Sequence, residues 1–267
     1  MKELSMTIVL ALAGLVLAGC VGGTAEKAAA PAENISNNAQ NRTVLFANLT
    51  YQVGNHAIQA IECIPNGTDA QTPGLVLTGG DGVTADKLLT VCDAFAKQGF
   101  VAMAHDNVEN GTALEDIEAV VEGARLLRTS IGPGRSSSPS RPVALWGHSA
   151  GTIFSLFAAY DPSVRPYAFI DTSGHMQVPV CDKRGQQDPA TCMAYLDEFP
   201  APILIVHGLD DKTVAPSFAQ MFAGRLTQNQ IRYQSLYVPD AGHEFMIDKP
   251  GVLQTETDFL RNSLNSS

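Results

Sequence analysis

The sequence has few basic residues and no second long apolar run, and these absences argue against several classes of protein. Lys and Arg together number 17 against 27 Asp and Glu, which gives a formal net charge of −10. An acidic surface without a run of Lys or Arg repels phosphate backbones, so nucleic-acid binding is not expected. Outside the first 20 residues, no stretch approaches the roughly 20 apolar residues that a membrane-spanning helix needs.

Signals for metals and cofactors are also missing. The six histidines do not show the spacing of metal ligands, and the zinc-binding pattern H-E-x-x-H does not occur. Residues 79–82 are rich in glycine but lack the lysine of a phosphate-binding P-loop. We therefore expect no metal, nucleotide or organic cofactor.

The N-terminus carries features of an export signal rather than of a fold. Residues 6–19 form an apolar run that fits the core of a signal peptide and is short for a membrane span. The run ends in Leu-Ala-Gly-Cys20, which resembles the lipobox of bacterial and some archaeal lipoproteins. The resemblance implies that residues 1–19 are removed, that the Cys20 thiol is lipidated and that the exported protein is anchored to a membrane; an ordinary signal peptide with a chance cysteine is the alternative. Residues 20–43 are expected to form a flexible tether to a single domain over 44–267.

Export would allow the cysteines other than Cys20 to form disulfides. The segment between Cys181 and Cys192 is polar and loop-like, which favours a local bridge between these two residues. A Cys63–Cys92 bridge then follows by elimination. Buried free thiols are the alternative.

The rest of the chain alternates strand and helix patterns. It is 45% hydrophobic and long enough to bury a sizeable core. Strands are expected at Val44–Phe46 with Leu49–Val53, Ala57–Ile64, Gly74–Leu77, Phe100–Ala104, Val143–Trp146, Tyr167–Ile170, Ile203–Val206 and Tyr233–Val238. Helices are expected at Ala85–Gln98, from Thr112 to about Leu127, and at Thr152–Tyr160, Ser217–Leu226 and Val252–Leu264. Repeated strand–helix units predict an α/β domain in which helices cover both faces of a mostly parallel sheet.

Two local signals mark helix ends. Gly99 is expected to end its helix in the left-handed conformation. Thr112 and Glu115 have the spacing of a capping box, which opens the next helix. An apolar stripe follows at helical spacing: Leu114, Ile117, Val120, Val121, Ala124 and Leu127.

A candidate nucleophile lies between a strand and a helix. Residues 147–151 read Gly-His-Ser-Ala-Gly, the G-x-S-x-G pattern, in the strand–turn–helix context that a nucleophile elbow requires. The tight turn forces Ser149 into a strained backbone conformation and presents its hydroxyl at the carboxyl edge of the sheet. A small turn residue without chemistry is the alternative interpretation. His148 is expected to point away from the nucleophile.

A carboxylate and a histidine follow the serine in the chain. Asp210 and Asp211 lie in the segment that follows the strand at Ile203–Val206, and His243 lies in a loop after the last strand. The order Ser, Asp, His is that of the α/β-hydrolase fold. Either carboxylate could orient the imidazole, and Asp171, which follows its own strand, is a further alternative.

At these residues the chain resembles the α/β-hydrolase superfamily, and within it the dienelactone-hydrolase-like branch. The resemblance rests on residues 147–151, on the H-G-x-x-D-x-x-V pattern from His207 to Val214, and on the loop around His243. By that pattern Asp211 aligns with the acid of the catalytic triad. Dienelactone hydrolases proper use a cysteine nucleophile, so the serine here argues against that activity in particular.

The resemblance implies an enzyme that hydrolyses small-molecule carboxylic esters. Ser149, His243 and Asp211 would be nucleophile, base and acid, and the backbone N–H groups of Gly80 and Ala150 would form the oxyanion hole. The stretch between Thr172 and Pro200 is too short for a large cap, so a small excursion near an accessible site is expected. The second hypothesis is a catalytically silent lipoprotein that binds a ligand in the same pocket.

Overall fold

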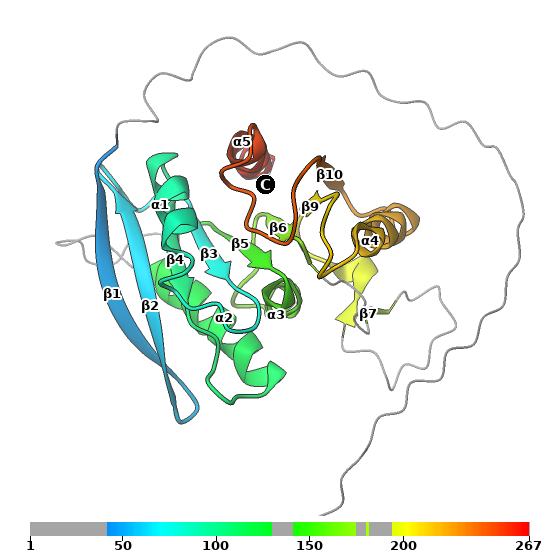
Figure 1. The fold of residues 1–267 in the computed structure, drawn as a ribbon. Coiled ribbons are helices and arrows are strands. Elements are labelled where there is room, and N and C mark those ends of the chain that lie inside the picture. The colour runs from blue at the N-terminus through cyan, green and yellow to red at the C-terminus, as the bar shows by residue number, and fades with distance from the viewer. Residues whose placement is uncertain (1–41, 130–140, 175–179, 182–193, 267) are drawn as a thin grey trace, which may run out of the picture. The chain divides into compact units, whose positions relative to one another are not determined.

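Eight strands form one sheet in the order β1-β2-β4-β3-β5-β6-β9-β10 (Figure 1). The structure is a computed structural model that describes residues 42–129, 141–174, 180–181 and 194–266. The strands are β1 (Val44–Val53), β2 (His56–Pro65), β3 (Gly74–Thr78), β4 (Val101–His105), β5 (Val143–His148), β6 (Phe169–Thr172), β9 (Ile203–Gly208) and β10 (Tyr233–Val238). The β1–β2 and β2–β4 pairs are antiparallel, and all other pairs of this sheet are parallel. The expected α/β fold with a mostly parallel sheet is confirmed.

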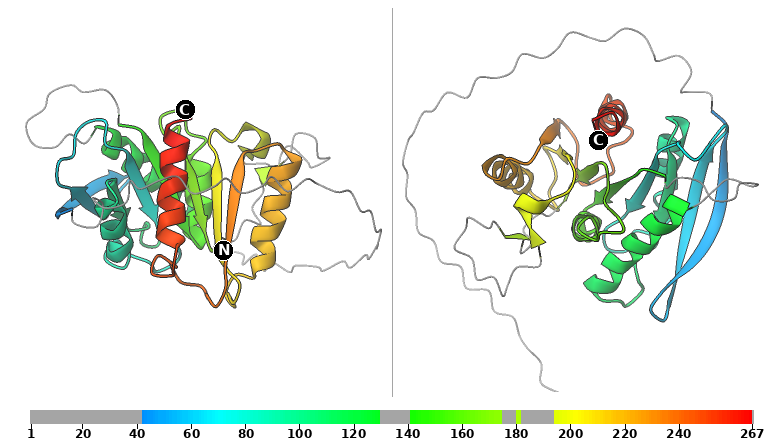
Figure 2. Two further views of the ribbon diagram at one scale, coloured as in Figure 1. Left: turned by 90° about the horizontal axis from the view of Figure 1, so that it is seen from above. Right: turned by 180° about the vertical axis from the view of Figure 1, so that it is seen from behind.

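Helices cover both faces of the sheet. Helices α2 (Ala113–Thr129), α3 (Ala150–Ala158) and α4 (Pro216–Gln228) pack on one face, and α1 (Leu89–Lys97) and α5 (Val252–Leu264) pack on the other (Figure 1). Figure 2 shows α5 running alongside the strands that it covers. Each face has its own buried apolar cluster, and every residue of β3, β4, β5, β6 and β9 is buried. Strands buried on both faces account for the continuous apolar runs of the sequence.

The expected helix ends are largely present. Gly99 has a φ of +97°. The backbone N–H of Thr112 donates to the Glu115 carboxylate at 2.8 Å, and the N–H of Glu115 donates to the Thr112 hydroxyl at 3.3 Å. Helix α1 begins at Leu89, later than expected, because residues 84–88 form tight turns.

The expected apolar stripe of α2 is wrong at its first residue. Leu114 is 60% exposed, whereas the buried residues of this helix begin at Ala119. The first turn of α2 therefore extends past the part of the helix that packs on the sheet.

A disulfide joins Cys63 of β2 to Cys92 of α1, with the two Cα atoms 5.9 Å apart. This pairing is confirmed, and the alternative of free thiols at these two positions is wrong. Cys20 and Cys192 lie outside the described residues, so lipidation and the Cys181–Cys192 bridge stay predictions.

The excursion expected between Thr172 and Pro200 is described in part. It contains a two-stranded parallel sheet of β7 (Val180–Cys181) and β8 (Ala194–Tyr195), followed by a 3₁₀ turn at Leu196–Glu198. Residues 175–179 and 182–193 lie outside the described ranges. Among the helices that the structure describes, none combines the length and the apolar character needed to cross a membrane.

Candidate active site

Ser149 occupies the sharp turn between β5 and α3. Its backbone has φ 55° and ψ −126°, a conformation that costs a non-glycine residue on the order of 1–3 kcal/mol. The flanking glycines are required by close backbone contacts. A Cβ on Gly147 would lie 2.5 Å from the Cα of Thr152, and one on Gly151 would lie 2.3 Å from the carbonyl oxygen of Thr78. The strained turn expected from the sequence is therefore present, and it holds the serine at the carboxyl edge of the sheet.

His243 lies within hydrogen-bond distance of Ser149 on one side and of Asp211 on the other. The Ser149 Oγ is 3.0 Å from His243 Nε2, and His243 Nδ1 is 2.7 Å from Asp211 Oδ2. Because an ionised carboxylate can only accept, Nδ1 carries the proton and Nε2 is free to accept from the serine hydroxyl. The structure thus brings together the three side chains singled out from the sequence.

The two alternative carboxylates lie elsewhere. Asp210 is exposed, although it directly precedes Asp211. Asp171 is completely buried at the end of β6, and its Oδ1 accepts from the backbone N–H of Gly174 at 3.0 Å. It is therefore the Asp211 carboxylate that contacts the imidazole of His243.

Backbone donors hold Asp211 in its ionised form. Burial favours the neutral acid, but hydrogen bonds from His243 and from the backbone N–H groups of Val214 and Thr213 outweigh burial and lower the pKa of Asp211. Both backbone bonds to Oδ1 are 2.8 Å long. His207 is buried beside them, with Nε2 2.9 Å from the Val214 carbonyl oxygen, as a hydrogen-bonding core residue should be.

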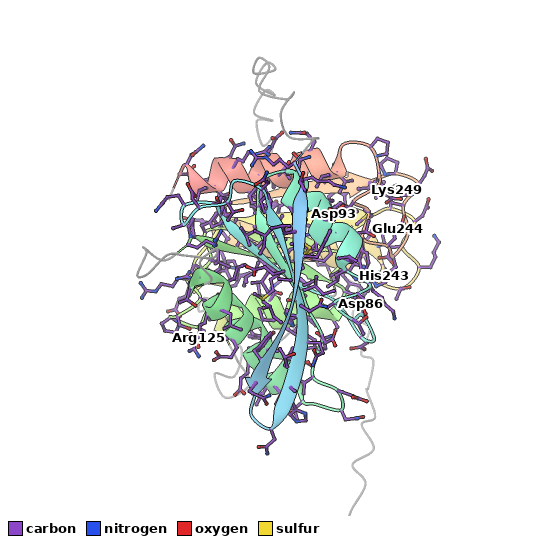
Figure 3. The ribbon with its side chains drawn as sticks, turned by 90° about the vertical axis from the view of Figure 1, so that its left-hand side faces the viewer. Asp86, Asp93, Arg125, His243, Glu244 and Lys249 are labelled. Carbon is purple, nitrogen blue, oxygen red and sulfur yellow. A yellow bond between two sulfur atoms is a disulfide. The ribbon has the colours of Figure 1, made fainter. Side chains whose placement is uncertain are left out.

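The loops that carry the acid and the histidine are packed directly against each other. A Cβ on Gly208 would lie 2.4 Å from the carbonyl oxygen of Ala241 and 2.5 Å from that of Gly242. The N–H of Asp210 donates to the same Ala241 carbonyl at 2.9 Å. The absence of a side chain at Gly208 thus lets the two loops approach. Figure 3 shows His243 at one edge of the domain, and its side chain is 18% exposed.

Gly80 lies against Ser149. A Cβ built on it would be 2.7 Å from Ser149 Cβ and 3.2 Å from the backbone nitrogen of Ala150. The two residues expected to form an oxyanion hole are therefore neighbours beside the serine. Asn107, which the sequence reasoning missed, donates from Nδ2 to the carbonyl oxygens of Gly79 and Gly80 at 3.1 Å each. Its position directly after β4 was the available signal, since it places Asn107 at the same sheet edge.

Three aromatic rings lie on the α5 side of His243, and we call Trp146, His148 and Phe245 the aromatic platform. The His148 ring centroid is 5.0 Å from that of His243 and 4.7 Å from that of Phe245. Burial, and next the proximity of His243, lower the pKa of His148 to about 3, so its ring is neutral. His148 is a packing residue, as expected, but it packs against the ring of His243.

Two buried carboxyl groups flank the site from opposite faces of the sheet. Burial raises the pKa of Asp171 to about 7 and that of Glu256 to about 8. Glu256 Oε1 accepts from Trp146 Nε1 at 3.1 Å and from the Thr172 hydroxyl at 3.4 Å. Within the described ranges, no cluster of three or more His, Cys, Asp or Glu side chains could hold a metal ion.

The raised pKa of Glu256 predicts a pH-dependent stability. The unfolded chain ionises this group near its ordinary pKa of 4.5, whereas the folded protein keeps it protonated up to about 8. The stabilising contribution that this raised pKa makes to the free energy of unfolding is therefore fully present below pH 4.5 and is lost as the pH rises to about 8. The free energy of unfolding of Glu256→Gln, minus that of wild type, should therefore be larger at pH 8.5 than at pH 4.5. Urea unfolding of both proteins at the two pH values measures this difference.

The matched control for this prediction is Asp258→Asn, an exposed carboxylate on the same helix. It should change the free energy of unfolding by a similar small amount at both pH values. An equal effect of Glu256→Gln at pH 4.5 and pH 8.5 would show that Glu256 is ionised in the folded protein.

The part of the sequence that carries this geometry is similar to a known protein family. Residues 137–267, which include the serine, the aspartate and the histidine, match the model of the prolyl oligopeptidase family. No curated protein matches the sequence.

Solved structures share the fold at low identity. Est1E from Butyrivibrio proteoclasticus is 16% identical with a TM-score of 0.62, over 82% of this chain and 99% of that one. Esterase 2 from Thermogutta terrifontis, phosphorylated by paraoxon, is 18% identical with a TM-score of 0.60, over 82% and 92%. An α/β serine hydrolase without a lid from Xanthomonas campestris is 18% identical with a TM-score of 0.55, over 83% and 94%.

The sheet order, the elbow and these structural matches define the chain as a protein with the α/β-hydrolase fold. Its C-terminal half, which carries all three hydrogen-bonded side chains, is similar in sequence to the prolyl oligopeptidase family. The closer resemblance to the dienelactone-hydrolase-like branch stays a prediction.

Proposed function

We propose that the protein is a serine hydrolase that cleaves carboxylic esters through an acyl-enzyme. The observation that carries the proposal is the continuous hydrogen-bonded series from Ser149 Oγ through His243 to Asp211, with the serine on a strained elbow. A strained residue is retained where its geometry is useful, and a neutral imidazole held by an ionised carboxylate is the arrangement that activates a serine hydroxyl.

The reaction proceeds by double displacement. His243 Nε2 takes the proton of Ser149 as Oγ attacks the ester carbonyl, and it gives that proton to the alcohol that leaves. Asp211 keeps the Nδ1 proton in place and stabilises the imidazolium. A water molecule, with His243 again as base, then attacks the acyl-enzyme and releases the carboxylic acid and the free serine.

Gly80 and Ala150 supply the oxyanion hole in this proposal. Their contact beside Ser149 supports a pair of backbone N–H donors aimed at the developing negative charge. One such donor is worth about 3 kcal/mol of transition-state stabilisation. Asn107 donates hydrogen bonds to the carbonyl oxygens of Gly79 and Gly80. Because the C=O and N–H of a trans peptide point in opposite directions, the N–H of Gly80 then points away from Asn107.

Esters are the favoured substrates, and peptide bonds are the second candidate. The esterase named among the similar structures supports esters, as does the small excursion between β6 and β9. The sequence match to the prolyl oligopeptidase family covers Ser149, Asp211 and His243 and favours amide cleavage as the alternative. The N-terminal resemblance to a lipobox supports an exported enzyme that is anchored to a membrane by lipid on Cys20.

The test is hydrolysis of a series of nitrophenyl esters of increasing acyl length, with matched nitroanilides, by protein that begins at residue 21. Turnover of the short-chain esters well above the Ser149→Ala background is expected, with little release from the anilides. Preferred cleavage of anilides would make the protein a peptidase. A folded protein that releases nitrophenol no faster than the variant would instead be a catalytically silent binder.

A further inference from the structure

Glu256 is a polar residue on the sheet-facing side of α5, where the surrounding side chains are apolar. It is completely buried, and its neighbours on the same side of the helix include Val252, Phe259 and Leu260. A carboxyl group at such a position lowers stability relative to an apolar side chain of similar size unless its hydrogen bonds compensate. Only one of its oxygens has a partner among the described residues. Stability alone therefore gives little reason for a glutamate here.

The hydrogen bonds of Glu256 fix a single indole ring. Oε1 accepts from Nε1 of Trp146, the only tryptophan of the chain, and the two residues come from elements 110 positions apart. Thr172 of the neighbouring strand β6 donates to the same oxygen. Trp146 is fully buried, so its indole is held by α5 on one side and by the sheet on the other.

The indole of Trp146 is one of the three rings of the aromatic platform, which packs against His243. The rings of Trp146 and His148 are nearly parallel, at 14° and 6.3 Å between centroids, and Phe245 contacts both rings edge-on at 6.2 and 4.7 Å. His148 in turn lies 5.0 Å from His243. Neither ring nitrogen of His148 has a hydrogen-bond partner in the described part of the chain, so this ring acts on its neighbours by packing.

His243 needs such support because of where it lies. No helix or strand is present between Val238 and Val252, so His243 is held by loop contacts, such as the close approach of Gly208 to Ala241 and Gly242, and not by regular secondary structure. Its two hydrogen bonds engage Nδ1 and Nε2, and the tilt of the ring plane depends on the Cβ–Cγ bond and on the groups that pack against the ring. His148 of the platform packs against it, with 5.0 Å between the ring centroids, and this contact helps to keep Nε2 directed at the serine.

We propose that Glu256 is a positioning residue for His243, acting through the indole of Trp146 and the rest of the aromatic platform. The proposal rests on the proposed function for its kinetic consequences. It assigns to a buried helix residue, remote in sequence from the serine, a role in the orientation of the base.

The test is a double-mutant cycle on nitrophenyl ester hydrolysis with Glu256→Leu, Trp146→Phe and the double variant. Each single variant should lower kcat about tenfold with little change in KM, because the base is misdirected while the substrate-binding surface is intact. The double variant should be no slower than the slower single variant, because both substitutions break the same connection. Glu256→Gln, which can still accept from the indole N–H, should keep most of the wild-type kcat.

The matched control is Thr257→Val, a fully buried neighbour on α5 whose hydroxyl bonds only to the backbone of Gln254 among the described residues. It should leave kcat within about twofold. A kcat loss in Thr257→Val as large as in Glu256→Leu, a Glu256→Gln variant as slow as Glu256→Leu, or additive losses in the double variant would each overturn the proposal. If Glu256→Leu does not fold, Glu256→Met takes its place, since methionine has a similar length and no carboxyl oxygen to accept from the indole N–H. It should be as slow as Trp146→Phe, and a Glu256→Met variant as fast as Glu256→Gln would overturn the proposal.

A second readout does not depend on turnover. In protein with isotope-labelled histidine, the ring resonances of His243 should shift in Trp146→Phe and stay near wild type in Glu256→Gln and Thr257→Val. Unchanged His243 resonances in Trp146→Phe would overturn the positioning role. A wild-type protein that hydrolyses no ester while these resonances respond as expected would refute the proposed function and leave the positioning role standing.

Discussion

Ser149→Ala is expected to lower kcat for ester hydrolysis by about 10⁴- to 10⁶-fold. The variant keeps the proposed oxyanion hole and the substrate-binding surface but has no oxygen to form the acyl-enzyme. Alanine fits the turn sterically, because it is smaller than serine and the close contacts there involve Gly147 and Gly151. The fold should therefore be retained, and the comparison is steady-state kinetics on the best short-chain nitrophenyl ester with a circular dichroism check of folding.

A suitable control is Ser155→Ala, which removes a buried hydroxyl from the same helix α3 without touching the elbow. Its kcat should stay within a few-fold of wild type. If the Ser149→Ala enzyme turned over at a rate within tenfold of wild type, the nucleophile would have to be a different group.

Asp211→Asn should lower kcat by about four orders of magnitude. The amide oxygen of asparagine can still accept from the backbone N–H groups of Thr213 and Val214, so the loop should keep its conformation. That choice turns the amide NH₂ group toward His243 Nδ1, which must then accept. The ring proton moves to Nε2, and the imidazole can no longer take a proton from Ser149.

Asp210→Asn is the matched control, since it neutralises the neighbouring carboxylate, which is exposed. Its kcat should lie within about twofold of wild type. Near-normal turnover in Asp211→Asn would mean that the 2.7 Å contact with His243 does not orient the base. The acid would then have to be sought at Asp210 or Asp171.

The site was predictable from the sequence where its geometry is local. The elbow at residues 147–151 depends on the two glycines and on the change from strand to helix, both of which lie within a few positions of Ser149. The meeting of Asp211 and His243 with Ser149 was predictable because the strands of a parallel sheet end at one edge. Choosing Asp211 over Asp210 from the sequence relied on a family pattern, and the structure separates the two carboxylates by burial and by contact with His243.

The parts that the sequence did not predict depend on how elements far apart in the chain are packed. Glu256 reaches Trp146 because of the rotation of α5 on the sheet, which no short pattern encodes. Asn107 contacts the Gly80 turn across 27 positions. Leu114 has the spacing of a core residue, yet it is exposed because α2 extends past the region where it packs. These features are properties of the tertiary structure.

The central claim is that the Ser149 hydroxyl is made nucleophilic by His243, and covalent labelling tests this claim most directly. Protein that begins at residue 21 would be incubated with a fluorophosphonate, and the adduct would be measured by intact mass and located by peptide mapping. The account predicts one adduct per chain, on Ser149, with labelling lost in Ser149→Ala and slowed by orders of magnitude in His243→Ala. A folded wild-type protein that acquires no adduct, or acquires it on another residue, would contradict the account.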